Sequence, residues 1–138
     1  MKTEINVTEF YSLSADYSKN RIYYIHLKAK WRNDAIFEQF RSDWIKAVDS
    51  MQKKFTVLAD LKLMQPMPNK FQKIMEELQQ YQLENGFLYS ASVISADDIA
   101  VLQVQRTVNR TELSVKHFNT EQQAEDFLDE IAENSNQE

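Results

Sequence analysis

The chain has 138 residues, of which 43% are hydrophobic, 12% aromatic and 27% charged. This composition excludes a disordered chain, and the length suffices for one hydrophobic core without disulfide or metal cross-links. The absence of cysteine excludes disulfides, thiolate nucleophiles and cysteine-based zinc sites, and it fits a reducing compartment. The net charge of -5 opposes general binding to nucleic-acid phosphates, which depends on clustered Lys and Arg.

The sequence carries no sign of export, of a membrane span or of a second domain. Residues 1–10 mix charged and apolar side chains, unlike the continuous apolar segment of a signal peptide, and every apolar run is shorter than a membrane span. We therefore expect a cytoplasmic protein. We expect one domain over residues 1–132, followed by a flexible acidic tail at residues 133–138.

Two segments near the N-terminus predict strands. Apolar and polar residues alternate over 5–10 and again over 21–30, and the turn-rich stretch 14–20 separates the two segments. We expect an N-terminal β-hairpin. A short basic series alternates at the end of its second strand: Lys28, Lys30 and Arg32. These side chains are more readily explained by a face exposed to solvent than by a nucleic-acid site.

The next segments predict a helix, a strand and a second helix. Asn33 is placed to cap a helix that runs to about Gln52, in which the apolar residues recur at helical spacing: Phe37, Phe40, Trp44, Val48 and Met51. The mostly apolar run 55–63 is typical of a central strand. The second helix ends at Gly86, the only glycine of the chain, which we expect as a left-handed C-terminal cap.

Two more strands and two more helices complete the chain. A strand over 87–94 precedes a capping box of Ser95 and Asp98, which opens a third helix to about Asn109. We expect this helix to turn three apolar residues inward: Ile99, Leu102 and Val108. A strand over 113–118 follows, and the pair Thr120 and Gln123 predicts the cap of the last helix.

Strands that alternate with helices need crossover connections, which favour parallel neighbours in one sheet. The expected fold class is therefore α/β, with a single mixed, mostly parallel sheet, an N-terminal β-hairpin and alternating helices in the order ββαβαβαβα.

Two stretches, TVLADL at 56–61 and VKHF at 115–118 followed by EQQAEDFL at 121–128, resemble the STAS superfamily, particularly its SpoIIAA-like, SEC14-related bacterial branch. The resemblance covers residues 6–131. It implies a SpoIIAA-like fold and a noncatalytic regulatory role. In anti-sigma-factor antagonists the phosphorylated Ser or Thr follows the strand that corresponds to 56–61, but no Ser or Thr occurs here between Asp60 and Ser90. Phosphorylation of a hydroxyl at that position is therefore not expected.

Most common chemistries lack their required residues. A single glycine cannot build a glycine-rich phosphate loop. The two histidines, His26 and His117, each stand alone on a predicted strand, where packing is favoured over general-base or metal-ligand roles. Ser90 and Ser92 fit a strand surface. We expect no catalytic residue, no cofactor and no metal.

The segment after residue 60 is the leading candidate for a contact with another protein or with a second copy of this chain. Its candidate residues are Asp60, Lys62, Met64, Met67, Asn69 and Lys70. Asp60 stands where open α/β sheets place their ligands, although bonding to the backbone amides of the following turn is favoured for it. The two methionines either expose adaptable apolar surface or fill the core beneath the loop.

The alternative function is the binding of a small apolar or lipid-like ligand beneath the first helix. Its pocket would be lined by Trp31, Phe37, Phe40 and Trp44, although their helical spacing favours core packing. An open pocket of roughly 300 Å³ or more would favour the ligand, and a filled core would favour surface recognition.

Overall fold

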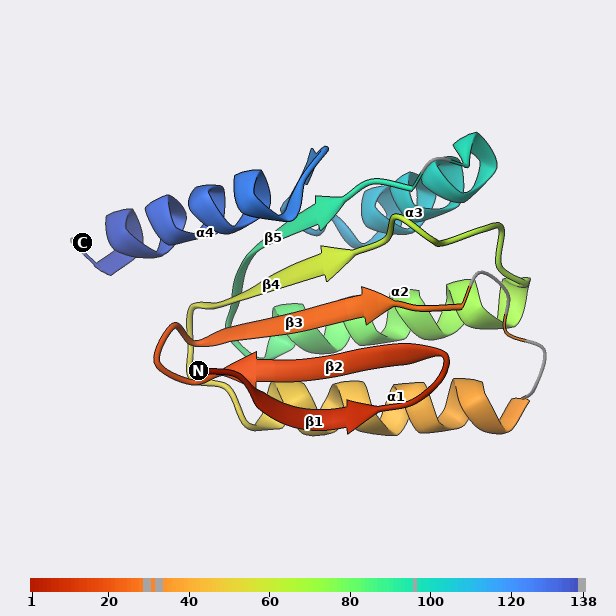
Figure 1. The fold of residues 1–138 in the computed structure, drawn as a ribbon, viewed down its shortest axis with the longest axis horizontal. Coiled ribbons are helices and arrows are strands. Elements are labelled where there is room, and N and C mark those ends of the chain that lie inside the picture. The colour runs from red at the N-terminus through yellow and green to blue at the C-terminus, as the bar shows by residue number, and fades with distance from the viewer. Residues whose placement is uncertain (29–30, 32–33, 96, 137–138) are drawn as a thin grey trace.

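The computed structural model describes residues 1–28, 31, 34–95 and 97–136. Six strands and four helices lie within these residues (Figure 1). Their bounds are β1 Thr3–Val7, β2 Tyr11–Asp16, β3 Arg21–His26, α1 Asp34–Asp49, β4 Phe55–Asp60, α2 Asn69–Glu84, β5 Phe87–Val93, α3 Asp98–Thr111, β6 Val115–Phe118 and α4 Glu121–Asn136.

All six strands form one mixed sheet in the order β1-β2-β3-β4-β5-β6. The pairs β1·β2 and β2·β3 are antiparallel, whereas β3·β4, β4·β5 and β5·β6 are parallel. Each parallel step is made through one helix, the usual crossover connection between parallel neighbours. The α/β class and the mixed, mostly parallel sheet are thus confirmed.

The N-terminal region differs from the expected hairpin, because it is a three-stranded antiparallel meander. The hydroxyl of Thr8 accepts hydrogen bonds from the backbone N–H groups of Phe10 (3.0 Å) and Tyr11 (3.1 Å), and this turn reverses the chain inside the segment expected as one strand. Residues 14–16, expected in a turn, instead belong to β2. In this strand Ser12 and Ser14 alternate with fully buried residues that face the core: Tyr11, Leu13 and Ala15.

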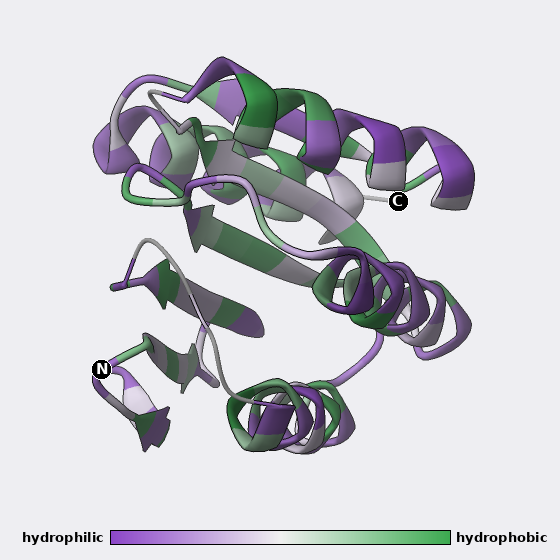
Figure 2. Cartoon of the chain, turned by 90° about the vertical axis from the view of Figure 1, so that its right-hand side faces the viewer, coloured by the Kyte–Doolittle hydropathy of each residue, from purple (hydrophilic) through white to green (hydrophobic). Residues whose placement is uncertain are grey.

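The sheet is covered on both faces (Figures 1 and 2). On one face α1, α2 and α3 enclose the larger core, to which β3 and β4 contribute Ile22, Tyr24, Phe55 and Val57. On the other face α4 packs on β4, β5 and β6 over a smaller core formed by Tyr23, Leu58, Ala91, Val93, Ala124 and Leu128. α4 reaches β3 at Arg21 and Tyr23, whereas no extensive contact joins α4 to β1 or β2 within the described residues, so this face is open over β1 and β2.

The helix ends follow local chemistry. The cap proposed at Asn33 lies outside the described residues. Gly86 has a φ of +92°, which confirms the left-handed position expected after α2. Thr120 accepts the N–H of Gln123 at 3.2 Å and caps α4, as predicted. Residues 133–136, expected in a flexible tail, continue α4.

Two expectations about α3 are wrong. Its N-cap is Asp97, which accepts the N–H of Ala100 at 2.9 Å, whereas the hydroxyl of Ser95 bonds the carbonyl of Met64. Ile99 and Leu102 face solvent, whereas Val108 is half-buried on the inward side, as expected; the most buried residues of α3 are smaller: Ala100, Thr107 and Thr111. Helical spacing reveals that an apolar stripe exists but not which stripe another element covers.

Candidate functional site

Asp60 ends β4 and is buried on the face covered by α4. One carboxylate oxygen accepts the backbone N–H of Lys62 at 3.1 Å, and the other lies 3.5 Å from the ammonium of the same lysine. This is the turn-bonding arrangement that the sequence left open. The side chain therefore holds the start of the loop that follows β4.

Met64 and Met67 are buried and point toward the core, not toward solvent. The hydroxyl of Ser95 donates to the carbonyl of Met64 at 2.5 Å. The amide of Gln103 bonds both backbone groups of Met67, accepting its N–H at 2.8 Å and donating to its carbonyl at 3.2 Å. Of the two interpretations of the methionines, core filling matches their position.

The other candidate residues of this loop are exposed. Lys62 lies at its start, and Asn69 and Lys70 form the first turn of α2. Lys70 pairs with Asp34 of α1 at 3.2 Å, which ties the beginnings of the two helices together. Lys62 is therefore separated from Asn69 and Lys70 by the buried methionines.

Exposed apolar side chains occur along the end of the sheet where β3, β4 and β5 finish. Leu27, Leu63 and Ile94 follow these strands at or near their last residues, and Ile99 and Leu102 stand on the first turns of α3. Their exposed fractions are Leu27 38%, Leu63 56%, Ile94 37%, Ile99 59% and Leu102 57%. We call these five residues the carboxyl-edge surface; Figure 2 views the molecule from this end.

The sequence predicted only part of this surface. The loop after β4 was predicted as a contact site, but its apolar contacts were expected from Met64 and Met67, which are buried, and Ile99 and Leu102 were expected in the core. The available signal was the repeated apolar residue after successive parallel strands, since parallel strands bring these positions to one edge.

A polar groove of about 310 Å³ lies on the face of the sheet that carries α4, between β2, β3 and the start of α4. Its lining includes Ser12, Ser14, Asp60, Glu121 and Glu125. The carboxyl groups of Asp60 and Glu121 meet there, and their interaction, with burial as the second cause, raises the pKa of Glu121 above its usual range.

Arg21 anchors α4 to the sheet beside this groove. Its side chain is only 1% exposed, and one guanidinium nitrogen lies 2.8 Å from Glu125 and 2.9 Å from Asp129. Burial alone would raise the pKa values of both carboxyls, but hydrogen bonds that include those from Arg21 outweigh it and leave both pKa values lowered. This network is structural, because its charges are paired.

The aromatic residues proposed as an apolar pocket form a packed cluster. Ring centroids are 5.2 Å apart for Trp31 and Phe40, 6.2 Å for Trp31 and Phe37, and 5.6 Å for Phe40 and Trp44. Phe71 of α2 closes on Trp31 at 5.0 Å. The first helix therefore covers a filled core, and only Trp44 borders an open space.

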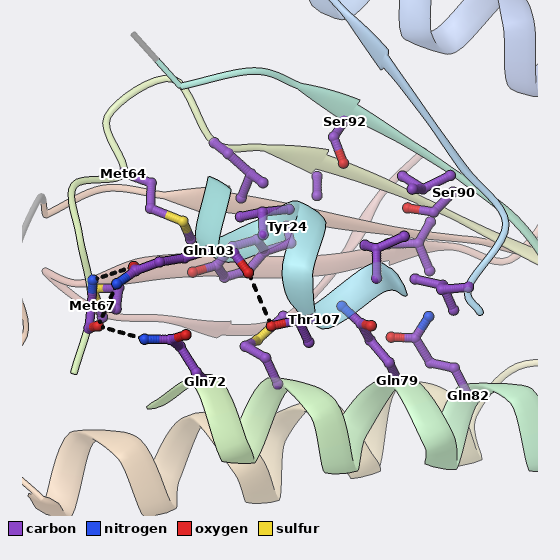
Figure 3. A pocket seen from close by; sticks show the side chains of 18 of the residues that line it. Tyr24, Met64, Met67, Gln72, Gln79, Gln82, Ser90, Ser92, Gln103 and Thr107 are labelled. Atoms are coloured by element: carbon purple, nitrogen blue, oxygen red, sulfur yellow. Dashed lines mark hydrogen bonds between the residues drawn. The ribbon is translucent and has the colours of Figure 1, made fainter. Parts of the chain in front are cut away.

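That space is a cavity of about 70 Å³ between the sheet, α2 and α3 (Figure 3). Its apolar walls include Met64, Met67 and Met75, and its polar groups include Gln79, Gln82, Ser90 and Ser92. The cavity is displaced from the pocket expected beneath the first helix.

The histidines are structural by their surroundings. His26 bonds the hydroxyl of Tyr24 at 2.8 Å and stacks on Trp31. Burial lowers the pKa of His117. Within the described residues, no cluster of three or more His, Asp or Glu side chains is arranged to hold a metal ion. No helix in that part of the chain is both long and apolar enough to cross a membrane.

The chain matches no known family model and no curated protein. Among solved structures it is similar to SiaC of Pseudomonas aeruginosa, with a TM-score of 0.53 and 8% sequence identity over 86% of this chain and 99% of that chain. At this identity the similarity concerns the fold alone. It agrees with the SpoIIAA-like α/β fold implied by the sequence resemblance.

Proposed function

We propose that this chain is a noncatalytic regulatory domain of the STAS type that binds another protein through the carboxyl-edge surface. The observation that carries the proposal is the exposure of five large apolar side chains at one end of the sheet. Isolated exposed apolar residues are ordinary, but a group of them marks an interaction site.

The construction of this end supports the proposal. The loop after β4 is held by Asp60 at its start and by the Gln103 amide at Met67. Leu63 therefore projects from a fixed loop, and Ile99 and Leu102 project from a helix. A rigid surface loses little conformational entropy on binding, so its apolar contacts contribute more fully to affinity.

The charged residues of the predicted site take a secondary role. Lys62, Asn69 and Lys70 are exposed near the surface and would form its polar rim, whereas Asp60, Met64 and Met67 support it from beneath. Rim charges mainly affect association rate and specificity. No Ser or Thr lies between Asp60 and Ser90, so the chain lacks the hydroxyl that is phosphorylated in anti-sigma-factor antagonists. The regulation proposed here is therefore by binding alone.

The proposed partner is a cytoplasmic protein or a second copy of this chain. The test compares the parent chain with the double variant Leu63→Ser and Ile99→Ser, using quantitative mass spectrometry of proteins captured from the native host and analytical ultracentrifugation of the purified chain. A matched control, Tyr17→Ser with Leu83→Ser, removes two exposed apolar residues at the opposite end of the sheet.

We expect the double variant to melt like the parent, because exposed substitutions change stability by only about 0.5 kcal/mol. It should lose capture or self-association by roughly tenfold or more, while the control keeps both. Equal binding by the parent and the double variant would overturn the proposal, as would a monomeric parent that captures no protein.

A further inference from the structure

We propose that the cavity between the sheet, α2 and α3 binds a small neutral molecule that joins an apolar body to an amide, carbonyl or hydroxyl group. This goes beyond the proposed function, since the cavity lies inside the domain and not on the carboxyl-edge surface.

The lining of the cavity selects against charge. It contains no Asp, Glu, Lys, Arg or His, and much of its wall is formed by the side chains of Met, Val, Leu and Phe residues. An ion that entered would lose its hydration without meeting an opposite charge, which costs several kcal/mol or more. A neutral molecule avoids this cost.

The polar side chains of the cavity keep unused hydrogen-bonding groups, although Gln79 accepts the hydroxyl of Thr111 at 2.6 Å through its carbonyl oxygen. Gln82 accepts the indole N–H of Trp44 at 2.8 Å through its carbonyl oxygen. Because that N–H is only a donor, the orientation of the amide is fixed and its NH₂ group remains a donor beside the cavity. The hydroxyls of Ser90 and Ser92 make no hydrogen bond to any residue that the structure describes.

These groups come from different elements but meet at one space. Gln79 and Gln82 reach it from α2, and Ser90 and Ser92 reach it from β5 (Figure 3). All four side chains are less than a tenth exposed. Polar groups that face a cavity can be hydrated by water, and a molecule that replaces this water and bonds them also gains apolar contact with the walls.

The volume limits the size of the occupant. A cavity of about 70 Å³ exceeds the roughly 10–15 Å³ that one water needs and is below the roughly 300 Å³ of a drug-sized pocket. The occupant is therefore a compact molecule, and ordered water is the competing outcome.

The methionines provide the test, using isobutyramide as the probe. Met64, Met67 and Met75 line the cavity, whereas Met1 and Met51 do not, so each spectrum contains its own control. In protein labelled with ¹³C at the methionine methyls, isobutyramide should shift the three cavity signals in a saturable way and leave Met1 and Met51 in place. Isobutyrate and isobutylamine, its charged analogues, should shift none of them.

A variant pair checks the location. Ser92→Val removes a cavity hydroxyl and fills space, and it should weaken isobutyramide binding by roughly fivefold or more. The matched control Ser12→Val changes a strand serine that lines the groove on the opposite face, and it should bind like the parent.

An absence of methionine shifts with isobutyramide would overturn the proposal and assign the cavity to water. Equal shifts from the charged analogues would also overturn it, and this outcome needs no variant to fold. Because the surface variants Leu63→Ser and Ile99→Ser leave the cavity intact, failure here is distinguishable from failure of the proposed function.

Discussion

Replacement of Gly86 by alanine tests how α2 is joined to β5. The residue has a φ of +92°, and its carbonyl accepts the N–H of Lys54 at 2.7 Å, which fixes the backbone there. A Cβ atom at this position would stand 3.0 Å from the Cα of Lys53 and 3.2 Å from its Cγ. Both the conformation and the contact oppose a side chain.

The backbone conformation and the close contact together set how much stability Gly86→Ala loses. A positive φ costs an L-residue about 1–2 kcal/mol, and the close backbone contact adds to this cost. Reduced freedom of the unfolded chain returns about 0.4–1 kcal/mol. We expect a net loss of about 1–2 kcal/mol, which for a chain of this size lowers the melting temperature by roughly 3–6 °C.

Urea denaturation measures this loss as a lower midpoint, provided that the slope of the unfolding free energy against urea concentration is the same in both proteins. Glu84→Ala is the control, because it alters the last turn of α2 without changing a left-handed residue. A Gly86→Ala midpoint equal to that of the parent would refute the argument from φ and contact.

Three further predictions address the interior and the groove. Arg21→Met should cost about 1–2 kcal/mol at neutral pH, discounted for the partly exposed acidic partners on α4. Since the pKa values of those partners are lowered in the folded state, the cost should shrink as pH falls through the acidic range, as urea titrations at several pH values will show. Asp60→Asn should return the raised pKa of Glu121 toward its usual value, measured by ¹³C NMR of the carboxyl group; an unchanged pKa would show that the pair does not interact. Replacing Met64 and Met67 together by serine should destabilise the fold by about 4 kcal/mol or more in thermal unfolding, whereas an unchanged melting curve would place them at the surface.

The periodicity of apolar residues predicted the helices and strands whose buried side is set by contact with the core. In α1 the spacing of Phe37, Phe40 and Trp44 predicted the buried stripe, and the apolar run of β4 predicted a central strand. The split between β1 and β2 was missed because the turn depends on the hydroxyl of Thr8, which sequence patterns do not resolve.

The site was only partly predictable, because its parts come from distant segments. The loop after β4 was identified from its position in the sheet, but the burial of Met64 depends on Ser95 and that of Met67 on Gln103. The cavity was not predicted. Its serines lie on β5 and its glutamines on α2, whereas the pocket expected from the sequence was lined by aromatic residues in and before α1.

Site-specific photo-crosslinking tests the proposed interaction surface most directly. A photoreactive phenylalanine derivative would be placed in turn at Leu63, Ile99 and Leu83 in the native host. The proposal predicts crosslinks to the same protein, or to a second copy of this chain, from Leu63 and Ile99, and none to it from Leu83 at the far end of α2. Equal crosslinking from all three positions, or crosslinking from Leu83 alone, would contradict it.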